Sequence, residues 1–148
     1  MAVSTVMRGR PVPTPADHLA LASAEKDSTV LRRLAHCPYP FVRQALAANP
    51  HTPPSALLDL SAARDSSWND NRLLRLLAEH PAADATVLRA VRDAVAEKLE
   101  EGERPYAAVL ALADRPELEA ETVRSLGTLA GASARLRRLL AQRLNPRV

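Results

Sequence analysis

The chain has 148 residues, of which 47% are hydrophobic, 25% are charged and only 3% are aromatic. This length suits one domain or one array of repeats, and the apolar content is sufficient for a core, which excludes wholesale disorder. The abundance of Ala and Leu favours helices over a β-sandwich or barrel. Cys37 is the single cysteine, which excludes an internal disulfide framework and a multi-cysteine metal or iron–sulfur cage.

The formal net charge is only +3, but the charges are unevenly distributed along the chain. Residues 93–121 carry nine acidic and three basic groups, whereas residues 122–148 carry six arginines and no acid. The opposite charges of these two segments allow head-to-tail self-association of the chain. No run of 18 apolar residues is present, and residues 1–15 lack the apolar centre of a secretory signal. We therefore expect a cytoplasmic protein with no membrane partner.

Proline and threonine residues mark the boundaries of the predicted helices. Residues 1–13 predict a flexible N-terminal segment, and residues 14–148 predict a single helical repeat domain. Thr14 and Thr52 each precede a proline, and this pair is typical of a helix N-cap followed by a residue with a preset φ. The predicted helices, in chain order, cover residues 15–25, 29–36, 40–48, 53–64, 70–79, 84–101, 106–114, 117–130 and 133–144.

A Leu-Ala-x-x-Pro motif recurs along the chain, at residues 34–38, 46–50, 77–81 and 112–116. Its proline keeps the preceding residue out of the α region and ends the helix before it. From Pro50 onward the motif prolines are about 30 to 35 residues apart, a period typical of helical solenoids. One short amphipathic helix cannot bury its apolar face alone, so successive pairs are expected to stack. The sequence therefore predicts an all-α fold of about eight or nine helices.

The segment from Val42 to Pro53 carries a family resemblance. It reads Val-Arg-Gln-Ala-Leu-Ala-Ala-Asn-Pro-His-Thr-Pro and is followed by a Leu-Leu-Asp-Leu run at residues 57–60. It resembles the leucine-rich repeat variant family, whose units read like Val-Arg-x-x-x-Ala-x-Asn-Pro-x-Thr-Pro and then Leu-x-x-Leu. The resemblance covers roughly residues 14–81, and residues 82–148 are similar to generic HEAT-like helix pairs.

This resemblance implies a short right-handed α-solenoid of stacked helix pairs, with surfaces that bind partners and no catalytic residues. The chain departs from the family in two ways. It has no counterpart of the cysteine-rich iron–sulfur segment of the family's founding member. The spacing of its motif prolines is also uneven, which predicts an irregular array.

Potential metal ligands and acid–base groups have simpler structural interpretations. His36 and Cys37 are adjacent, so on a helix their side chains point about 100° apart and do not readily bind one ion. The spacing of the histidines and Cys37 matches no zinc signature. The acidic run between Glu97 and Glu103 is typical of a solvated helix face. We therefore expect no metal, no cofactor and no catalytic constellation.

The few aromatic residues leave two interpretations open. Trp68 lies in a stretch that predicts a polar loop, where it either folds back over its own helix pair or forms a contact hot spot for a partner. Tyr39 and Phe41, which flank Pro40, are predicted to form a wedge between two repeats; packing is the preferred role of Phe41, and the role of Tyr39 is left open.

The expected function is a non-catalytic protein–protein interaction scaffold or accessory subunit. The alternative is a nucleic-acid-binding HEAT-like array that uses an arginine-rich face. A DNA-glycosylase-like enzyme is the weakest alternative, because Trp68 beside Asp65 or Asp70 is its only candidate site. The candidate interaction residues are Arg32, Arg33, Arg43, Trp68, Arg72, Arg75, Arg135, Arg137 and Arg138.

Overall fold

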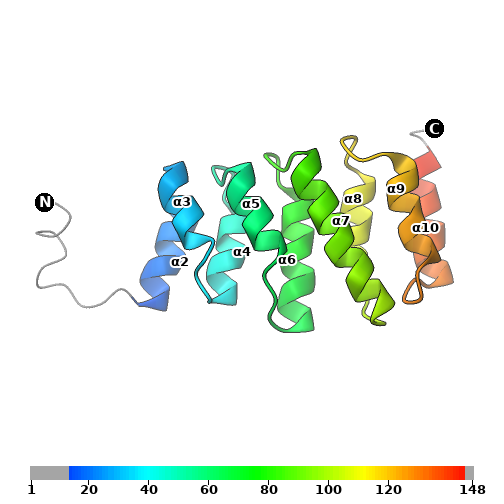
Figure 1. Ribbon diagram of the computed structural model, residues 1–148, viewed down its shortest axis with the longest axis horizontal. Helices are drawn as coiled ribbons and strands as arrows, with labels where there is room; N and C mark the ends of the chain where they lie inside the picture. The colour runs from blue at the N-terminus through cyan, green and yellow to red at the C-terminus, as the bar shows by residue number, and fades with distance from the viewer. Residues whose placement is uncertain (1–13, 146–148) are drawn as a thin grey trace, which may run out of the picture.

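The computed structural model describes residues 14–145, and within them every regular element is a helix (Figure 1). The prediction of an all-α fold with eight or nine helices is confirmed. The predicted N-terminal segment, residues 1–13, lies outside the described residues. The elements are α2 (Pro15–Ala24), α3 (Ser28–Leu34), α4 (Pro40–Ala48), α5 (Pro54–Ser61), α6 (Ser67–Glu79), α7 (Ala85–Glu100), α8 (Tyr106–Ala113), α9 (Ala120–Arg124), the 3₁₀ turn η1 (Ser125–Thr128) and α10 (Ala134–Leu144).

The helices lie in two rows. In one row α2 packs on α4, α4 on α6, α6 on α8 and α8 on α10. In the other row α3 packs on α5 and α5 on α7, and α9 continues this row in Figure 1. The core lies between the rows and consists largely of buried Leu, Ala and Val side chains. The right-handed twist implied by the family resemblance stays a prediction.

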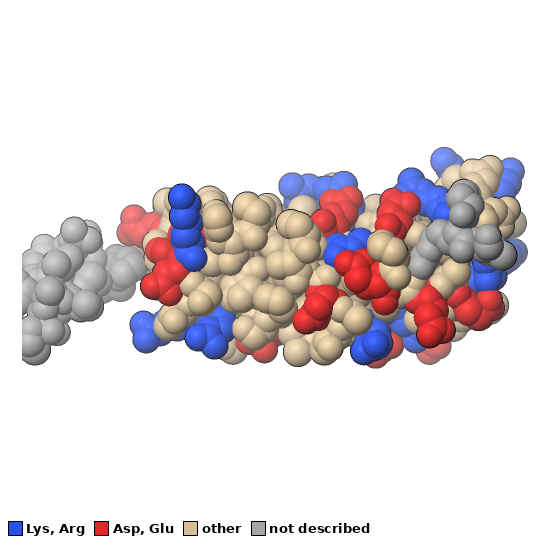
Figure 2. Space-filling view, turned by 90° about the horizontal axis from the view of Figure 1, so that it is seen from above, with Lys and Arg blue, Asp and Glu red and all other residues tan. Residues whose placement is uncertain are grey.

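The loops that carry Pro50, Pro81 and Pro116 lie along one edge of the molecule, at the top of Figure 1, whereas the loop that carries Pro38, between α3 and α4, lies at the opposite edge. Figure 2 shows this edge from above. Charged side chains stand at its N-terminal end, the adjoining middle stretch is largely uncharged, and acidic and basic side chains are mixed over its C-terminal half.

Asn49, the residue before the motif proline Pro50, connects α4 to the preceding repeat. Its side chain is buried, and Nδ2 donates to the Ala22 carbonyl at 2.9 Å and the Glu25 carbonyl at 2.8 Å, both at the end of α2. Its Oδ1 accepts from the His51 amide at 2.9 Å. Asn49 therefore satisfies carbonyls that the end of a helix leaves without a partner.

His80 holds the same motif position in the next repeat and also reaches back. Its Nδ1 accepts from the Ala82 amide at 3.0 Å, so Nε2 carries the proton and donates to the Asn49 carbonyl at 2.8 Å. Burial lowers the pKa of His80 below 6.5, although the hydrogen bond to Asn49 opposes this shift. The buried imidazole is therefore held in its neutral form.

Stability is expected to depend on pH through His80. Folding lowers the pKa of His80, so the unfolded chain binds a proton at a higher pH than the folded chain does. The contribution of His80 to the free energy of unfolding is therefore complete above about pH 6.5 and is lost as the pH falls below that value. Urea unfolding of the wild type and of His80→Gln at about pH 7.5 and pH 5.5 tests this. Between these two pH values the wild type is expected to lose more stability than the variant does. Equal losses would contradict the claim that the lowered pKa of His80 makes stability depend on pH.

Arg115 holds this position in the motif copy at residues 112–116. Its guanidinium donates to the carbonyls of Ala78, His80 and Ala83 at 2.7–2.9 Å and pairs with Glu117 at 2.9 Å. It therefore covers the C-terminal end of α6. Asparagine, histidine and arginine thus perform one structural task in the three motif copies that follow α4, α6 and α8, whereas the copy that follows α3 has Cys37 at this position.

The predicted role of Thr14 is confirmed and that of Thr52 is wrong. Thr14 caps α2, and its hydroxyl accepts from the Asp17 amide at 3.2 Å. The Thr52 hydroxyl is instead buried and donates to the Leu46 carbonyl at 2.7 Å, near the end of α4. Pro54 causes the difference, because it keeps Pro53 in an extended conformation and delays the start of α5 by one residue.

One further prediction on the helices is wrong. The helix expected over 117–130 is divided into α9 and η1. Phe41, for which packing was the preferred role, stacks on Tyr39 with 5.6 Å between the ring centroids and is still 41% exposed. Val42 takes the buried position, because neighbours on a helix point about 100° apart.

Candidate functional site

The surface is hollowed along α8, between α6 and α10. Two adjoining hollows of about 340 and 460 Å³ share Arg75 and Ala107 in their walls. The recess arises because α8 presents small side chains, such as the exposed Ala107, between the longer side chains of α6 and Arg143 of α10. We call the two hollows together the α8 groove. Its walls are formed chiefly by Trp68, Asn71, Arg72, Arg75, Glu79, Arg104, Pro105, Tyr106, Ala107, Leu110, Asp114 and Arg143.

Trp68 lies in the first turn of α6 and not in a loop, so this prediction is wrong. The Ser66 hydroxyl accepts from the Asn69 amide at 3.2 Å and caps α6, which begins at Ser67 instead of residue 70. Trp68 is 76% exposed, which contradicts the interpretation that it folds back over its own helix pair. It stands at one end of the α8 groove.

The early start of α6 places Trp68 on one face with two predicted arginines. Trp68, Arg72, Arg75 and Glu79 follow one another at intervals of four, three and four residues, which is the spacing of a single helix face. All four line the groove. The α6 wall therefore combines an exposed aromatic ring with guanidinium groups.

The guanidinium of Arg72 is positioned by a relay of hydrogen bonds. Its Nε donates to Oε1 of Gln44 at 3.1 Å, and Gln44 Nε2 donates to Oδ1 of Asn69 at 3.0 Å. Asn69 Nδ2 in turn donates to Oδ2 of Asp65 at 2.7 Å, a bond that lowers the pKa of Asp65. The terminal nitrogens of Arg72 have no partner among the described residues.

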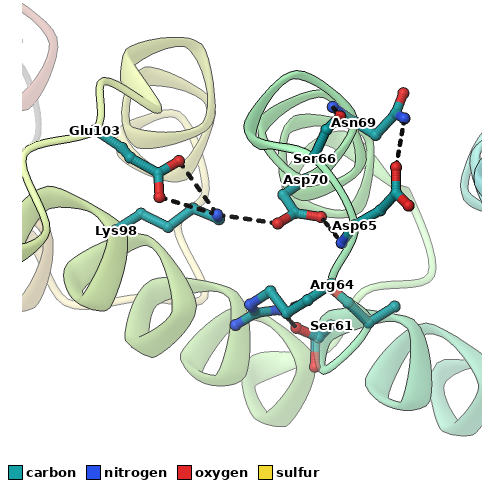
Figure 3. A network of polar contacts seen from close by, with 9 residues as sticks. Ser61, Arg64, Asp65, Ser66, Asn69, Asp70, Lys98 and Glu103 are labelled. Atoms are coloured by element: carbon teal, nitrogen blue, oxygen red, sulfur yellow. Dashed lines mark hydrogen bonds and ion pairs between the residues drawn. The ribbon is translucent and has the colours of Figure 1, made fainter.

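The relay connects to a buried ion-pair network (Figure 3). The Asp65 amide donates to Oδ1 of Asp70 at 2.6 Å, and Lys98 Nζ lies 3.0 Å from Oδ2 of Asp70 and 3.3 Å from Glu103. Asp70 and Lys98 are each 5% exposed. A hydrogen bond from Ser67 and the nearby Lys98 ammonium lower the pKa of Glu103. The network fixes the start of α6 against α7 and so supports the groove wall.

The first hollow is cationic. Arg72, Arg75 and Arg104 line it, and no carboxylate does. The Arg104 side chain has no hydrogen bond or ion pair with any residue between 14 and 145, and Arg75 Nε is 4.0 Å from the Glu79 carboxylate. Oδ1 of Asn71 is buried in the same wall without a hydrogen-bond partner in this part of the chain.

The second hollow, unlike the first, is lined by acidic as well as basic side chains. Asp114 lies 2.6 Å from Arg143, which also donates to the Leu110 carbonyl. Glu79 lines this hollow as well. The ion pair of Arg143 holds α10 against α8, and α10 continues to Leu144.

The remaining predicted arginines do not join this site. Arg32 and Arg33 are exposed on α3, in the other row. Arg43 Nε donates to the Cys37 carbonyl at 3.1 Å, and Arg137 lies against the carbonyls of Gly127 and Ala132. The last two, Arg135 and Arg138, are exposed on α10.

Several groove residues were not predicted from the sequence. No local sequence pattern marks Arg104 or Asn71 as a site residue, because each joins the groove only through the packing of α6 against α8. The one available signal was the Tyr-Ala-Ala-Val-Leu-Ala-Leu-Ala sequence of α8, whose small residues leave room at its surface. The Tyr106 hydroxyl donates to the Gly131 carbonyl at 2.9 Å, which fixes the ring in the groove wall.

The acidic segment 93–121 is partly neutralised within the fold. Five of its acids form ion pairs with basic residues, which leaves less free charge for the predicted self-association. These pairs are Asp93 with Arg92, Glu103 with Lys98, Asp114 with Arg143, Glu117 with Arg115, and Glu121 with Arg124.

Residues 14–145 contain no group of three or more His, Cys, Asp or Glu side chains arranged to hold a metal ion. In the same residues, no helix combines the length and apolarity required to cross a membrane. Comparison of the chain with protein-family models, curated protein sequences and solved structures finds no match. The resemblance to leucine-rich repeat variants therefore stays a prediction.

Proposed function

We propose that this protein is a non-catalytic protein-binding module whose α8 groove takes a short segment of a partner protein. The observation that carries the proposal is the exposure of Trp68 at the end of a recess with a small-residue floor. Trp and Arg are enriched among the residues that dominate binding energy in protein interfaces. Trp68, Arg72 and Arg75 supply both residue types on one face of α6.

The fixed geometry around the groove supports binding rather than catalysis. The carboxylates of Asp65 and Asp70 accept hydrogen bonds that hold the start of α6, and Lys98 is enclosed between Asp70 and Glu103. These groups therefore hold a wall in place instead of facing the recess. A pre-positioned wall reduces the entropy lost when a partner binds.

The arrangement of the arginines favours a protein partner over nucleic acid. A nucleic-acid-binding array requires basic side chains that follow the phosphate backbone across one face. Here Arg32 and Arg33 lie in the other row from Arg72 and Arg75, and Arg43 is bonded to the Cys37 carbonyl. Only part of the predicted set thus lies along one recess.

Filling the groove is expected to abolish peptide binding. A displayed library of random peptides of about 12 residues, long enough to extend beyond α8, is selected on the wild-type chain. Ala107→Gln places a larger neutral side chain on the groove floor without removing a helix former. We expect selected peptides to bind this variant at least about tenfold more weakly, because the larger side chain occupies space in the groove that the peptide needs.

The matched control is Ala20→Gln, which changes an exposed alanine of α2. Selected peptides are expected to bind this control as they bind the wild type. The proposal is contradicted if no peptide is enriched, or if the enriched peptides bind Ala107→Gln as tightly as the wild type.

A further inference from the structure

We infer that the segment bound in the α8 groove is acidic, with its carboxylates seated on Arg72, Arg75 and Arg104 and an apolar side chain against Trp68. This inference rests on the proposed function and specifies the chemistry of the partner. It follows from the free hydrogen-bonding capacity and the charge of the first hollow.

Arg72 is prepared to bind a carboxylate. The bond from its Nε to Gln44 fixes the plane of the guanidinium and leaves the two terminal nitrogens without partners among the described residues. A guanidinium matches the two oxygens of a carboxylate with parallel hydrogen bonds. Because the relay through Gln44 and Asn69 already restricts the side chain, less conformational freedom is lost on binding.

The local charge favours an anion in the first hollow. Three guanidinium groups line it with no carboxylate in its wall, and the side chain of Arg104 makes no ion pair with the described residues. The apolar surfaces of Trp68 and Tyr106 lie in the same wall. A segment with acidic and apolar side chains complements both features.

The second hollow makes a peptide a better occupant than a nucleic acid. Asp114 and Glu79 line the continuation of the groove, and the guanidinium groups of Arg115 and Arg143 in the same wall already pair with Glu117 and Asp114. A polyanion that extended from the first hollow into the second would bring phosphates near these carboxylates, which is unfavourable. A peptide places carboxylates only where the arginines are and neutral side chains above Ala107 and Leu110.

The peptides selected on the wild-type chain test the inference directly. We expect them to be enriched in Asp and Glu relative to the input library. The most enriched peptide is then synthesised with a fluorescent label, together with a counterpart in which Asn and Gln replace its Asp and Glu. Anisotropy titrations at ~50 and ~200 mM salt compare the two peptides, since charge-dependent binding weakens with salt.

The expected results are specific to the arginines of the first hollow. The amide counterpart binds at least about tenfold more weakly than the acidic peptide, and Arg72→Gln weakens the acidic peptide by a similar factor. The matched control is Arg89→Gln, which removes an exposed arginine of α7 in the other row and leaves binding unchanged.

The outcomes separate this inference from the proposed function. If the selected peptides are neutral or basic and still fail to bind Ala107→Gln, the groove binds peptides but the acidic inference is wrong. If no peptide depends on Ala107, both fail. A labelled single-stranded oligo-dT serves as a polyanion probe, and Arg72-dependent binding of it that is tighter than that of any selected peptide would also overturn the inference.

Discussion

Replacement of Lys98 by methionine is expected to lower the free energy of unfolding by about 3–5 kcal/mol. Lys98 Nζ is the ammonium partner of buried Asp70, at 3.0 Å, and both residues are 5% exposed. Methionine has a similar length and apolar character, so the change removes the charge without opening a large cavity. The Asp70 carboxylate is then left buried with only the Asp65 amide as a donor.

Urea unfolding of the full chain at neutral pH measures this loss. Glu97→Gln is the control, because it removes an exposed charge from the same helix and is expected to change stability by less than about 0.5 kcal/mol. The double variant Lys98→Met with Asp70→Asn distinguishes loss of the charge partner from loss of packing. It is expected to be more stable than Lys98→Met alone, since no buried charge remains. A double variant less stable than the single one would contradict this explanation.

Replacement of Asn49 by alanine is expected to lower the free energy of unfolding by about 2–4 kcal/mol, because one buried and two partly buried backbone groups lose their hydrogen-bond partner together. The carbonyls of Ala22 and Glu25 lose the Nδ2 donor, and the His51 amide loses its acceptor. The buried side chain also leaves a void between the first two repeats. Urea unfolding monitored by circular dichroism measures the effect.

Asn145 provides a matched control for Asn49. It precedes Pro146 in the last, imperfect copy of the motif, but it is exposed. Asn145→Ala is therefore expected to change stability by less than about 0.5 kcal/mol. Equal effects of the two substitutions would show that burial and the contacts to α2 do not explain the role of Asn49.

The helix boundaries that the sequence predicted well are those set by local chemistry. Thr14 before a proline defines the start of α2, and the motif prolines Pro50 and Pro81 follow the ends of α4 and α6. These signals act within a few residues, so the sequence contains them directly. The start of α6 was missed, because Ser66 and its polar neighbours are equally typical of a loop and of a helix cap.

The candidate site was predictable only in part. Trp68, Arg72 and Arg75 were all singled out, but they share a face only once α6 is known to begin at Ser67. The bond between Gln44 and Asn69 joins residues 25 positions apart on different helices, and no local pattern encodes it. Likewise, the groove floor at Ala107 becomes recessed only through the longer side chains that flank α8.

The motif also shows why a recurring sequence does not require recurring side chains. Asn49, His80 and Arg115 differ in size and charge, yet each donates to backbone carbonyls of the preceding repeat. The common requirement is a donor that reaches an unsatisfied helix end. Sequence comparison at these positions alone would therefore miss their shared role.

The fluorescence of Trp68 tests the central claim most directly, because it is the only tryptophan in the chain and lies at the end of the groove. The wild-type protein is titrated with the most enriched peptide chosen to lack tryptophan, and the emission maximum and acrylamide quenching are recorded. Burial of the ring by the peptide predicts a shift to shorter wavelength and weaker quenching. Saturable peptide binding with unchanged emission and quenching would contradict the claim that Trp68 and the α8 groove form the binding surface.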